Sequence, residues 1–188
     1  MTELLTPRLR LRSWQPSDLT LLTALNADPE VMRFIGDGSV FTPEQSEQQW
    51  LRIQRLWDER GFGIHPVELR ESGEFLGWVG LAVPAFLPEI LPAVEIGWRL
   101  ARPAWGHGYA TEAAQAVLAR AFDELGLERI VSICHVDNHA SANVMTKLGL
   151  TLDRRTTVPS HGGAVKVLAL TAEEYRSGRG QRLGGGQS

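Results

Sequence analysis

Two glycines, Gly106 and Gly108, stand one residue apart in the stretch RPAWGHGYATEA, directly before a run of helix-forming residues. The first turn of a helix presents backbone N–H groups that have no intrahelical partner, together with the positive end of the helix dipole. Glycine permits a positive φ in the turn and lets a ligand approach the backbone closely. The stretch therefore fits either a plain turn into a helix or a site that binds an anion such as phosphate.

The spacing of these glycines argues against two familiar phosphate sites. A dinucleotide-binding G-x-G-x-x-G would need a third small residue where Thr111 stands, inside an early βαβ unit with an acidic residue about 20 positions further on. The P-loop pattern G-x-x-x-x-G-K-[ST] is absent from the sequence. A phosphate-bearing ligand of another kind has to be considered.

Hydrophobic periodicity predicts the elements around the glycines. AVEIGWRL before them is a predicted strand, and a helix is expected from about Gly108 to Leu125. RIVSICHV is almost continuously apolar, which is typical of a strand covered on both faces. A short helix in DNHASANVMTKLGL should end at Gly149, and the last two predicted strands are TLDRRTTV and AVKVLAL.

The N-terminal half also carries clear local signals. We expect a strand through Leu9 and Leu11, a helix in QPSDLTLLTALNADPE, and a hairpin in FGIHPVELRESGEFLGWVGLAV. The strongest helix is predicted in FTPEQSEQQWLRIQRLWDERG, where Thr42 caps a T-x-x-Q box and Gly61 ends the helix. Together these elements predict one mixed α/β domain over residues 1–175. The Gly-rich residues 176–188 are expected to form a disordered tail.

Composition narrows the class of protein. The net charge of −3 and a pI near 6.0, without a basic block, argue against a nucleic-acid partner. No apolar run reaches the roughly 20 residues that span a bilayer, and the N-terminus lacks the apolar region of a signal peptide. The single cysteine, Cys134, excludes an internal disulfide and a cysteine-based metal cluster. We therefore expect a cytoplasmic protein without a metal cofactor.

The stretch from Ala93 to Leu150 closely resembles the acyl-CoA-binding core of the GNAT-superfamily N-acetyltransferases, in the branch that includes the ribosomal-protein N-terminal-alanine acetyltransferases. The family loop [Q/R]-x-x-G-x-[G/A] is matched by WGHGYA, with Trp105 first, and the later N-x-x-S…K-L-G pattern is matched from Asn138 onward. The resemblance covers roughly residues 6–171. It implies a mixed, mostly antiparallel twisted sheet of about six or seven strands, splayed at the acyl-CoA site and flanked by about four helices.

The resemblance also implies which residues hold acetyl-CoA. The loop and helix start would bind the pyrophosphate through Trp105, Gly106, His107, Gly108, Tyr109, Ala110 and Thr111. Backbone groups of Trp98, Arg99 and Leu100 would pair with the pantetheine arm. The helix beyond the next strand would add Asn138, Asn143 and Lys147, although Asn138 can also be a simple N-cap and Lys147 a solvated charge.

The implied chemistry is attack of a neutral amine on the thioester carbonyl. At pH 7, removing the proton costs about 1.4 kcal/mol for an α-amine and about 4.6 kcal/mol for a lysine, so a general base helps. Glu95, on the face of its strand opposite to Val94 and Ile96, is the predicted base, or else a half-exposed carboxylate paired with an arginine. Ser141 is the predicted acid for the leaving thiolate, or else an ordinary first-turn residue of its helix. A backbone N–H of Ile96 or Trp98 could polarise the carbonyl. Less favoured proton carriers are His65, His135 and His139.

The acceptor is the least determined feature. Many aromatic residues lie in the N-terminal half, where the family builds its acceptor site, and either form an aromatic groove or belong to the core: Trp14, Phe34, Trp50, Trp57, Phe62 and Trp78. Three acidic residues, Glu30, Asp37 and Glu44, either attract a cationic amine or are ordinary surface charges. We expect acetyl transfer to a protein or peptide N-terminus. The alternatives are a small amine, a polyamine or an aminoglycoside as acceptor, another acyl donor such as a succinyl thioester, or a non-catalytic CoA-binding module, in a monomer or homodimer.

Overall fold

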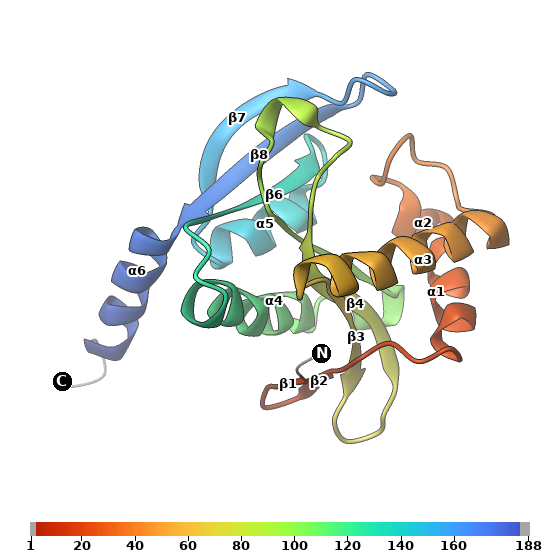
Figure 1. Cartoon of the computed structure of the whole chain (residues 1–188), viewed down its shortest axis with the longest axis horizontal. Helices are drawn as coiled ribbons and strands as arrows, with labels where there is room; N and C mark the ends of the chain where they lie inside the picture. The colour runs from red at the N-terminus through yellow and green to blue at the C-terminus, as the bar shows by residue number, and fades with distance from the viewer. Residues whose placement is uncertain (1–2, 185–188) are drawn as a thin grey trace.

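The computed structural model describes the backbone of residues 3–184 and the side chains of residues 3–179 (Figure 1). Its single sheet has the strand order β1-β2-β3-β4-β5-β6-β8-β7, and β5–β6 is the parallel pair. The strands are β1 (Leu4–Leu5), β2 (Leu9–Leu11), β3 (Ile64–Leu69), β4 (Phe75–Ala82), β5 (Glu95–Leu100), β6 (Arg129–His135), β7 (Thr151–Thr157) and β8 (Ala164–Thr171). The helices are α1 (Asp18–Asn26), α2 (Pro29–Met32), α3 (Pro43–Arg60), α4 (Tyr109–Ala119), α5 (His139–Lys147) and α6 (Ala172–Gly184).

This architecture confirms the predicted fold class but has more elements than expected, since the described residues form six α-helices where about four were expected. The sheet has eight strands in the described residues rather than six or seven, because the two-residue β1 pairs with β2 through Leu4 and Leu11. A strand of two residues is too short to show an alternation of apolar and polar side chains. A π-helical turn (Arg120–Glu124) follows α4, and 3-10 turns stand at Pro88–Ile90 and Arg102–Ala104.

The two faces of the sheet carry different helices. On one face, α4 and α5 enclose the main core, in which Ile96, Phe122 and Met145 are at most 2% exposed. On the other face, α1 and α3 pack through Leu22, Ile53 and Trp57 (Figure 1). Because successive strand residues point to opposite faces, Ile96 and its neighbour Glu95 are directed to different helix layers.

The α3 helix forms for the local reasons that its sequence indicates. Thr42 accepts a hydrogen bond from the Gln45 N–H, and the Gln45 side chain accepts one from the Thr42 N–H, which completes the predicted capping box. Gly61 ends the helix in the left-handed conformation at φ 69°. These signals lie within a few residues of each other, so they could be recognised without tertiary information.

The C-terminal segment differs from the expectation of disorder. Residues 172–184 form α6, which begins with a second capping box between Thr171 and Glu174. Tyr175 stacks on Phe122 at 4.7 Å between ring centroids, and Arg179 pairs with Asp123 at 2.5 Å. The predicted tail is therefore helical from residue 176 to 184, because contacts of α6 with the π turn that follows α4 outweigh the weak helix propensity of glycine. Residues 185–188 lie outside the described part of the chain.

Within residues 3–184, no helix combines the length and the apolar composition that crossing a bilayer requires.

Candidate active site

The sheet opens between β5 and β6. The two strands are joined at their beginnings, where the Val131 N–H donates to the Val94 carbonyl at 2.9 Å and Glu95 stands opposite Val131. The Ser132 hydroxyl then donates to the Ile96 carbonyl at 2.8 Å. No later pair of residues continues the ladder between these two described strands. The strands therefore separate beyond Ile96, as the resemblance implied.

The open edge of β5 offers backbone groups from alternate residues. Val94 and Ile96 direct their carbonyls toward β6, so Trp98 is the next residue with its N–H and carbonyl on that edge. Arg99 alternates with Trp98, so its backbone N–H and carbonyl face β4 in the ladder between β4 and β5. The Leu100 carbonyl accepts a hydrogen bond from the Trp105 indole at 2.7 Å. The predicted backbone contact with pantetheine thus fits Trp98, but it does not fit Arg99.

Glu95 lies where the opening begins and shares its strand face with Gly97 and Arg99. Its side chain is half-buried. Burial raises the pKa of the Glu95 carboxyl to about 8, and the Ile133 backbone N–H opposes this shift by favouring the charged form. A carboxyl group with a pKa near the operating pH can accept a proton and release it again.

The glycine loop has the geometry of an anion site. Gly106 and Gly108 adopt φ values of 78° and 81°, and Gly108 is the N-cap of α4. Since glycine has no side chain, no capping group occupies the first N–H groups of this helix. His107 and Gly108 are exposed. No side chain of the described residues occupies these first N–H groups of α4, which is the arrangement that an anion such as a phosphate requires.

An ion pair that the sequence did not predict supports the same loop. Arg8, just before β2, pairs with Glu112 of α4 at 2.6 Å and donates to the His107 carbonyl at 3.0 Å. Thr6 donates to the other Glu112 oxygen at 2.6 Å, and these partners lower the pKa of the Glu112 carboxyl against the effect of burial. Arg8 thereby offsets a negative charge in the turn that would bind phosphate. The partners lie 104 residues apart, so no local pattern in the sequence indicates this pair.

The start of α5 faces the other side of the opening. Asn138 accepts a hydrogen bond from the Ser141 N–H at 3.0 Å, so it is the N-cap of this helix. Its amide N–H₂ donates to no group of the described residues. Ser141 is half-buried, Asn143 is exposed, and Lys147 is the last residue of α5, about 13 Å along the helix axis from the cap.

Substituting Asn138 separates capping from ligand binding. Asn138→Ser should keep the free energy of unfolding within about 0.5 kcal/mol of wild type, because serine and asparagine cap equally well. It should raise the KM for acetyl-CoA by about 10-fold, since the amide donor is lost. Asn138→Ala should raise KM equally and also lose about 1 kcal/mol of stability. Urea denaturation measures the free energy of unfolding, and steady-state kinetics measure the KM. An unchanged KM in the serine variant would show that Asn138 acts only as a helix cap.

The aromatic residues of the N-terminal half divide into two groups. Trp14 and Trp57 are each 7% exposed and belong to the core between the sheet and α3, with Trp50 packed against them, and Phe62 is buried in the main core. Phe34 and Trp78 are only half-buried, although Trp78, like Trp50, also packs against the core that α1 and α3 cover. Phe34 stacks on His135 at the end of β6, with 5.6 Å between ring centroids. These two residues are the predicted aromatics that can line an acceptor site.

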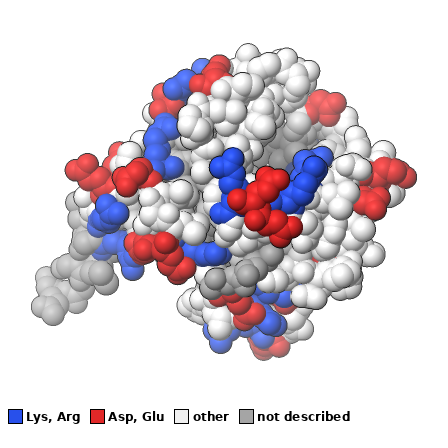
Figure 2. All heavy atoms as spheres, viewed as in Figure 1, with Lys and Arg blue, Asp and Glu red and all other residues white. Residues whose placement is uncertain are grey.

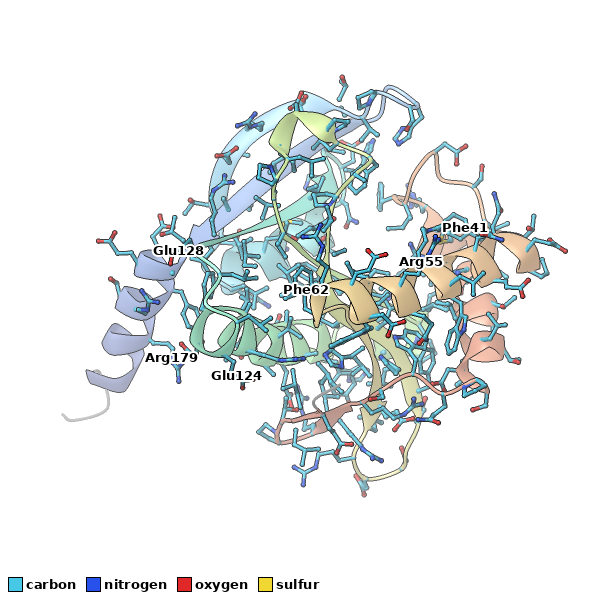
Figure 3. The ribbon with its side chains drawn as sticks, in the orientation of Figure 1. Phe41, Arg55, Phe62, Glu124, Glu128 and Arg179 are labelled. Carbon is cyan, nitrogen blue, oxygen red and sulfur yellow. The ribbon has the colours of Figure 1, made fainter. Side chains whose placement is uncertain are left out.

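The surface is hollowed between the part of the molecule that carries β6–β8 and the part that carries α1–α3 (Figure 2). The segment before α3 borders this region, and Figure 3 labels Phe41 at its end, near the start of α3. The ring centroid of Phe41 lies 5.7 Å from the guanidinium carbon of Arg99 on β5, whereas Phe34 stacks on His135 of β6. Residues 34–41 therefore reach from one diverging strand to the other.

The remaining histidines and the cysteine are poorly placed for the reaction or are buried. His65 is 2% exposed, its ring nitrogen lies 3.1 Å from the Arg12 carbonyl, and burial lowers its pKa to about 4. Cys134 is 6% exposed, and burial raises the pKa of its thiol. His139 is exposed on α5. His135 is half-buried at the end of β6, where it stacks on Phe34.

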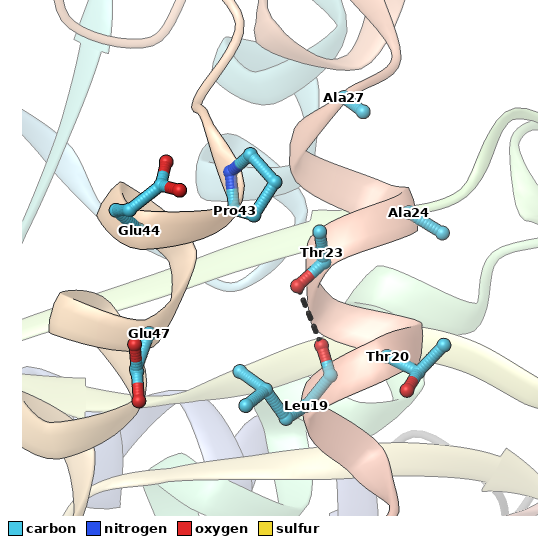
Figure 4. A pocket seen from close by; sticks show the side chains of 8 residues that line it. All are labelled: Leu19, Thr20, Thr23, Ala24, Ala27, Pro43, Glu44 and Glu47. Atoms are coloured by element: carbon cyan, nitrogen blue, oxygen red, sulfur yellow. Dashed lines mark hydrogen bonds between the residues drawn. The ribbon is translucent and has the colours of Figure 1, made fainter.

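Two surface grooves lie beside the opening rather than in it. One, of about 570 Å³, separates α1 from α3 and contains Glu44 at its rim (Figure 4). The other, of about 620 Å³, is lined by Asp28, Glu30, Arg102, Pro103 and Trp105. Glu44 and Glu30 are thus on exposed surface outside the gap between β5 and β6, and Asp37 is exposed as well.

A sheet that parts between two parallel strands, an uncapped helix N-terminus at the mouth and a carboxyl group at the closed end define the class of a coenzyme A-dependent acyltransferase. Residues 8–151 match the family model of the acetyltransferase (GNAT) domain. The chain belongs to this family, and it is an acetyl-CoA-dependent N-acetyltransferase.

Two relatives and one solved structure illustrate the similarity. Protein YkkB of Bacillus subtilis is 35% identical over 152 residues, which cover 79% of this chain and 85% of YkkB. The FsC-acetyl coenzyme A-N(2)-transacetylase of Aspergillus fumigatus is 38% identical over 68% of this chain and 55% of that enzyme. An acetyltransferase from Agrobacterium tumefaciens superposes with a TM-score of 0.78 at 28% identity, over 90% of this chain and 94% of the other.

More distant structures share the fold but differ in acceptor. They include RimL, a ribosomal L7/L12 α-N-protein acetyltransferase solved with coenzyme A, with a TM-score of 0.72 at 20% identity over 90% of this chain and 98% of RimL. They also include the Vibrio cholerae spermidine N-acetyltransferase, solved with coenzyme A and spermine, with a TM-score of 0.73 at 18% identity over 91% and 99% of the two chains. The shared fold therefore does not identify the acceptor.

Proposed function

We propose that this enzyme transfers the acetyl group of acetyl-CoA to a primary amine by direct attack in a ternary complex, and that its preferred acceptor is the N-terminal amine of a protein or peptide. The observation that carries the proposal is the position of Glu95 beside the open edge of β5. Its carboxyl group stands at the closed end of the gap, where β5 and β6 are still paired. Glu95 lies two residues before Gly97, near the edge of β5 on which the Trp98 N–H and carbonyl are exposed. An amine that enters from the α1–α3 face would meet a base and a thioester together.

In this mechanism the residues divide the work between binding and proton transfer. The Gly106–Ala110 loop holds the pyrophosphate, and Asn138 holds the pantetheine arm. The Trp98 N–H donates to the thioester oxygen as negative charge develops on it, and this N–H suits that role better than the Ile96 N–H, because the Glu95–Val131 bridge already engages Ile96. Glu95 accepts the proton of the attacking amine, directly or through water. Ser141 donates a proton to the departing thiolate and regains one from solvent water in the same step.

The role of Ser141 has a modest expected effect. Ser141→Ala should lower kcat by about 10-fold, less than the roughly 10²–10⁴ that general acids usually contribute, because a thiol with a pKa near 8.5 leaves readily without help. Ser141→Thr keeps a hydroxyl and should retain most of the rate. Stopped-flow measurement of thiol release under single-turnover conditions isolates the step, and equal rates in the alanine variant and wild type would rule the serine out as the acid.

Two measurements test the proposal as a whole. Isothermal titration calorimetry with acetyl-CoA should show binding in the micromolar range, and no heat at high micromolar ligand would contradict the enzymatic assignment. A library of peptide N-termini, amino acids, polyamines and aminoglycosides should then be screened by thiol release. Turnover of peptides above small amines supports the preferred acceptor. The named activity of the Aspergillus relative makes a small N(2)-amine the second candidate, and faster turnover of such amines would replace the peptide preference.

A further inference from the structure

Arg99 is a buried arginine on the face of the sheet that α1 and α3 cover, the face from which the acceptor amine is proposed to enter. It lies on β5 with 7% of its surface exposed. Its guanidinium carbon is 5.3 Å from the Trp78 ring centroid and 5.7 Å from that of Phe41, and its Nη1 donates to the Asn26 side-chain oxygen. Asn26 is itself fixed, because its amide donates to Ser46 at 3.1 Å and to Gln49 at 2.8 Å. A network between α1 and α3 thus holds the guanidinium in place.

This guanidinium has no carboxylate partner among the side chains of residues 3–179. Arg12 provides a comparison, since its side chain is 14% exposed and pairs with both Asp18 and Glu68 at 2.6 Å. The hydrogen-bond partner of Arg99 is a neutral amide, and its buried Nε has no acceptor in the part of the chain that the structure describes. A buried charge without a counterion is costly, and buried charges in proteins are normally paired. Burial lowers the pKa of Arg99 to about 10, so the side chain stays charged at neutral pH.

The position of Arg99 relates it to the reacting amine. Glu95, Gly97 and Arg99 share one face of β5, and four residues of strand separate the Cα atoms of Glu95 and Arg99 by about 13 Å. Gly97 contributes no side chain of β5 between them, and the Trp78 ring lies over this glycine, 3.7 Å from where a Cβ would stand, so that an acceptor would lie along that ring. An extended molecule with its amine at Glu95 could therefore place its other end near Arg99.

We propose that Arg99 binds a carboxylate of the acceptor, so that the substrate is an amine that carries an acid group several bonds from the reacting nitrogen. The inference rests on the proposed acetyl transfer and narrows its substrate class. Arginine suits the task because its planar guanidinium can pair with both oxygens of a carboxylate. The neutral Asn26 orients the guanidinium without neutralising it. A peptide with an acidic residue after its N-terminal residue and an ω-amino acid both meet this description.

Matched acceptor pairs test the proposal. The pairs are 6-aminohexanoate with 6-aminohexanamide, and Ala-Glu-Ala-amide with Ala-Gln-Ala-amide, added to the library of the acetyl-transfer screen. Wild type should favour the acidic member of at least one pair by about 10- to 100-fold in kcat/KM, chiefly through KM, as expected for a charge-assisted contact. In Arg99→Met this ratio should fall to about 1. Arg99→Lys, which keeps the charge without the fork geometry, should retain part of the ratio.

Controls separate this role from a purely structural one. Arg55→Met removes an exposed arginine of α3 (Figure 3) and should leave the ratio as in wild type. Thermal unfolding shows which variants are folded, and the lysine variant keeps the test available if the methionine variant is not. If amines are acetylated with equal kcat/KM for acidic and neutral members, or if Arg99→Met and Arg99→Lys both keep the wild-type ratio, Arg99 is held only by its aromatic contacts and the inference fails. If nothing in the whole library is acetylated, the proposed transfer fails first.

Discussion

Glu95→Gln is expected to lower kcat by about 100-fold, at the lower end of the roughly 10²–10⁴ contribution of a general base. Glutamine keeps the shape of glutamate and an oxygen that can accept from the Ile133 N–H, so the change removes proton transfer and little else. Single-turnover kinetics at saturating acetyl-CoA would measure the loss. Glu71→Gln is a matched control, because Glu71 is an exposed glutamate in the β3–β4 turn, and it should retain the wild-type rate.

The pH dependence gives a second readout of the same substitution. A base must be unprotonated to act, and the carboxyl of Glu95 has a pKa of about 8. With an acceptor whose own pKa lies below 7, wild-type kcat/KM should rise with pH and level off above about pH 8. The Glu95→Gln variant should lose this rise. A variant that keeps both the rate and the rise would place the base elsewhere, and His135 would be the next residue to replace.

The raised pKa of Glu95 also affects the free energy of unfolding. The effect is opposite to that of a carboxylate in an ion pair, whose pKa is lowered by folding. Folding raises the pKa of Glu95 from its ordinary value near 4.5 to about 8, so the folded state binds a proton that the unfolded state has released between these pH values. Stability contributed at this position falls as pH rises through that window. Glu95→Gln should therefore raise Tm by several degrees at pH 9 and by much less at pH 5. Differential scanning calorimetry at the two pH values would show whether the stabilisation grows with pH.

The sequence predicted those features of the molecule that depend on neighbouring residues. The capping box at Thr42, the end of α3 at Gly61 and the cap at Asn138 each involve residues at most a few positions apart. The strand face of Glu95 followed from alternation. The same alternation directs the Arg99 side chain to the α1–α3 face and its backbone to β4, so alternation alone argues against a backbone contact between Arg99 and pantetheine.

The parts that could not be predicted depend on contacts between distant residues. Arg8 meets Glu112 across 104 positions, and Arg99 meets Asn26 across 73. Neither pair leaves a local pattern, because any arginine and any polar partner satisfy the sequence equally well. The separation of β5 from β6 also came from family resemblance, since an apolar strand such as β6 has the same composition whether its neighbour is paired or parted.

Gly108→Val is expected to raise the Kd for acetyl-CoA by about 100-fold, which corresponds to the loss of two charge-assisted hydrogen bonds of roughly 1.5 kcal/mol each. Gly108 adopts a φ of 81°, a conformation that a β-branched residue rarely accepts. A Cβ at this position would lie 3.6 Å from the Arg8 Nη2, an ordinary contact, so the protein itself has room for it. The loss should come from the displaced backbone and from a side chain that stands where the pyrophosphate would approach the first N–H groups of α4.

Gly162→Val provides the matched control. Gly162 has a similar φ of 71°, lies in the turn between β7 and β8, and would place a Cβ with no atom within 4 Å. Its substitution should lower stability by a similar amount, through the same backbone strain, and should leave the Kd for acetyl-CoA unchanged. Calorimetric titration of both variants, with their Tm values, distinguishes loss of the anion site from general destabilisation. Equal affinity in Gly108→Val and wild type would reduce the two glycines of WGHGYA to a plain turn into a helix.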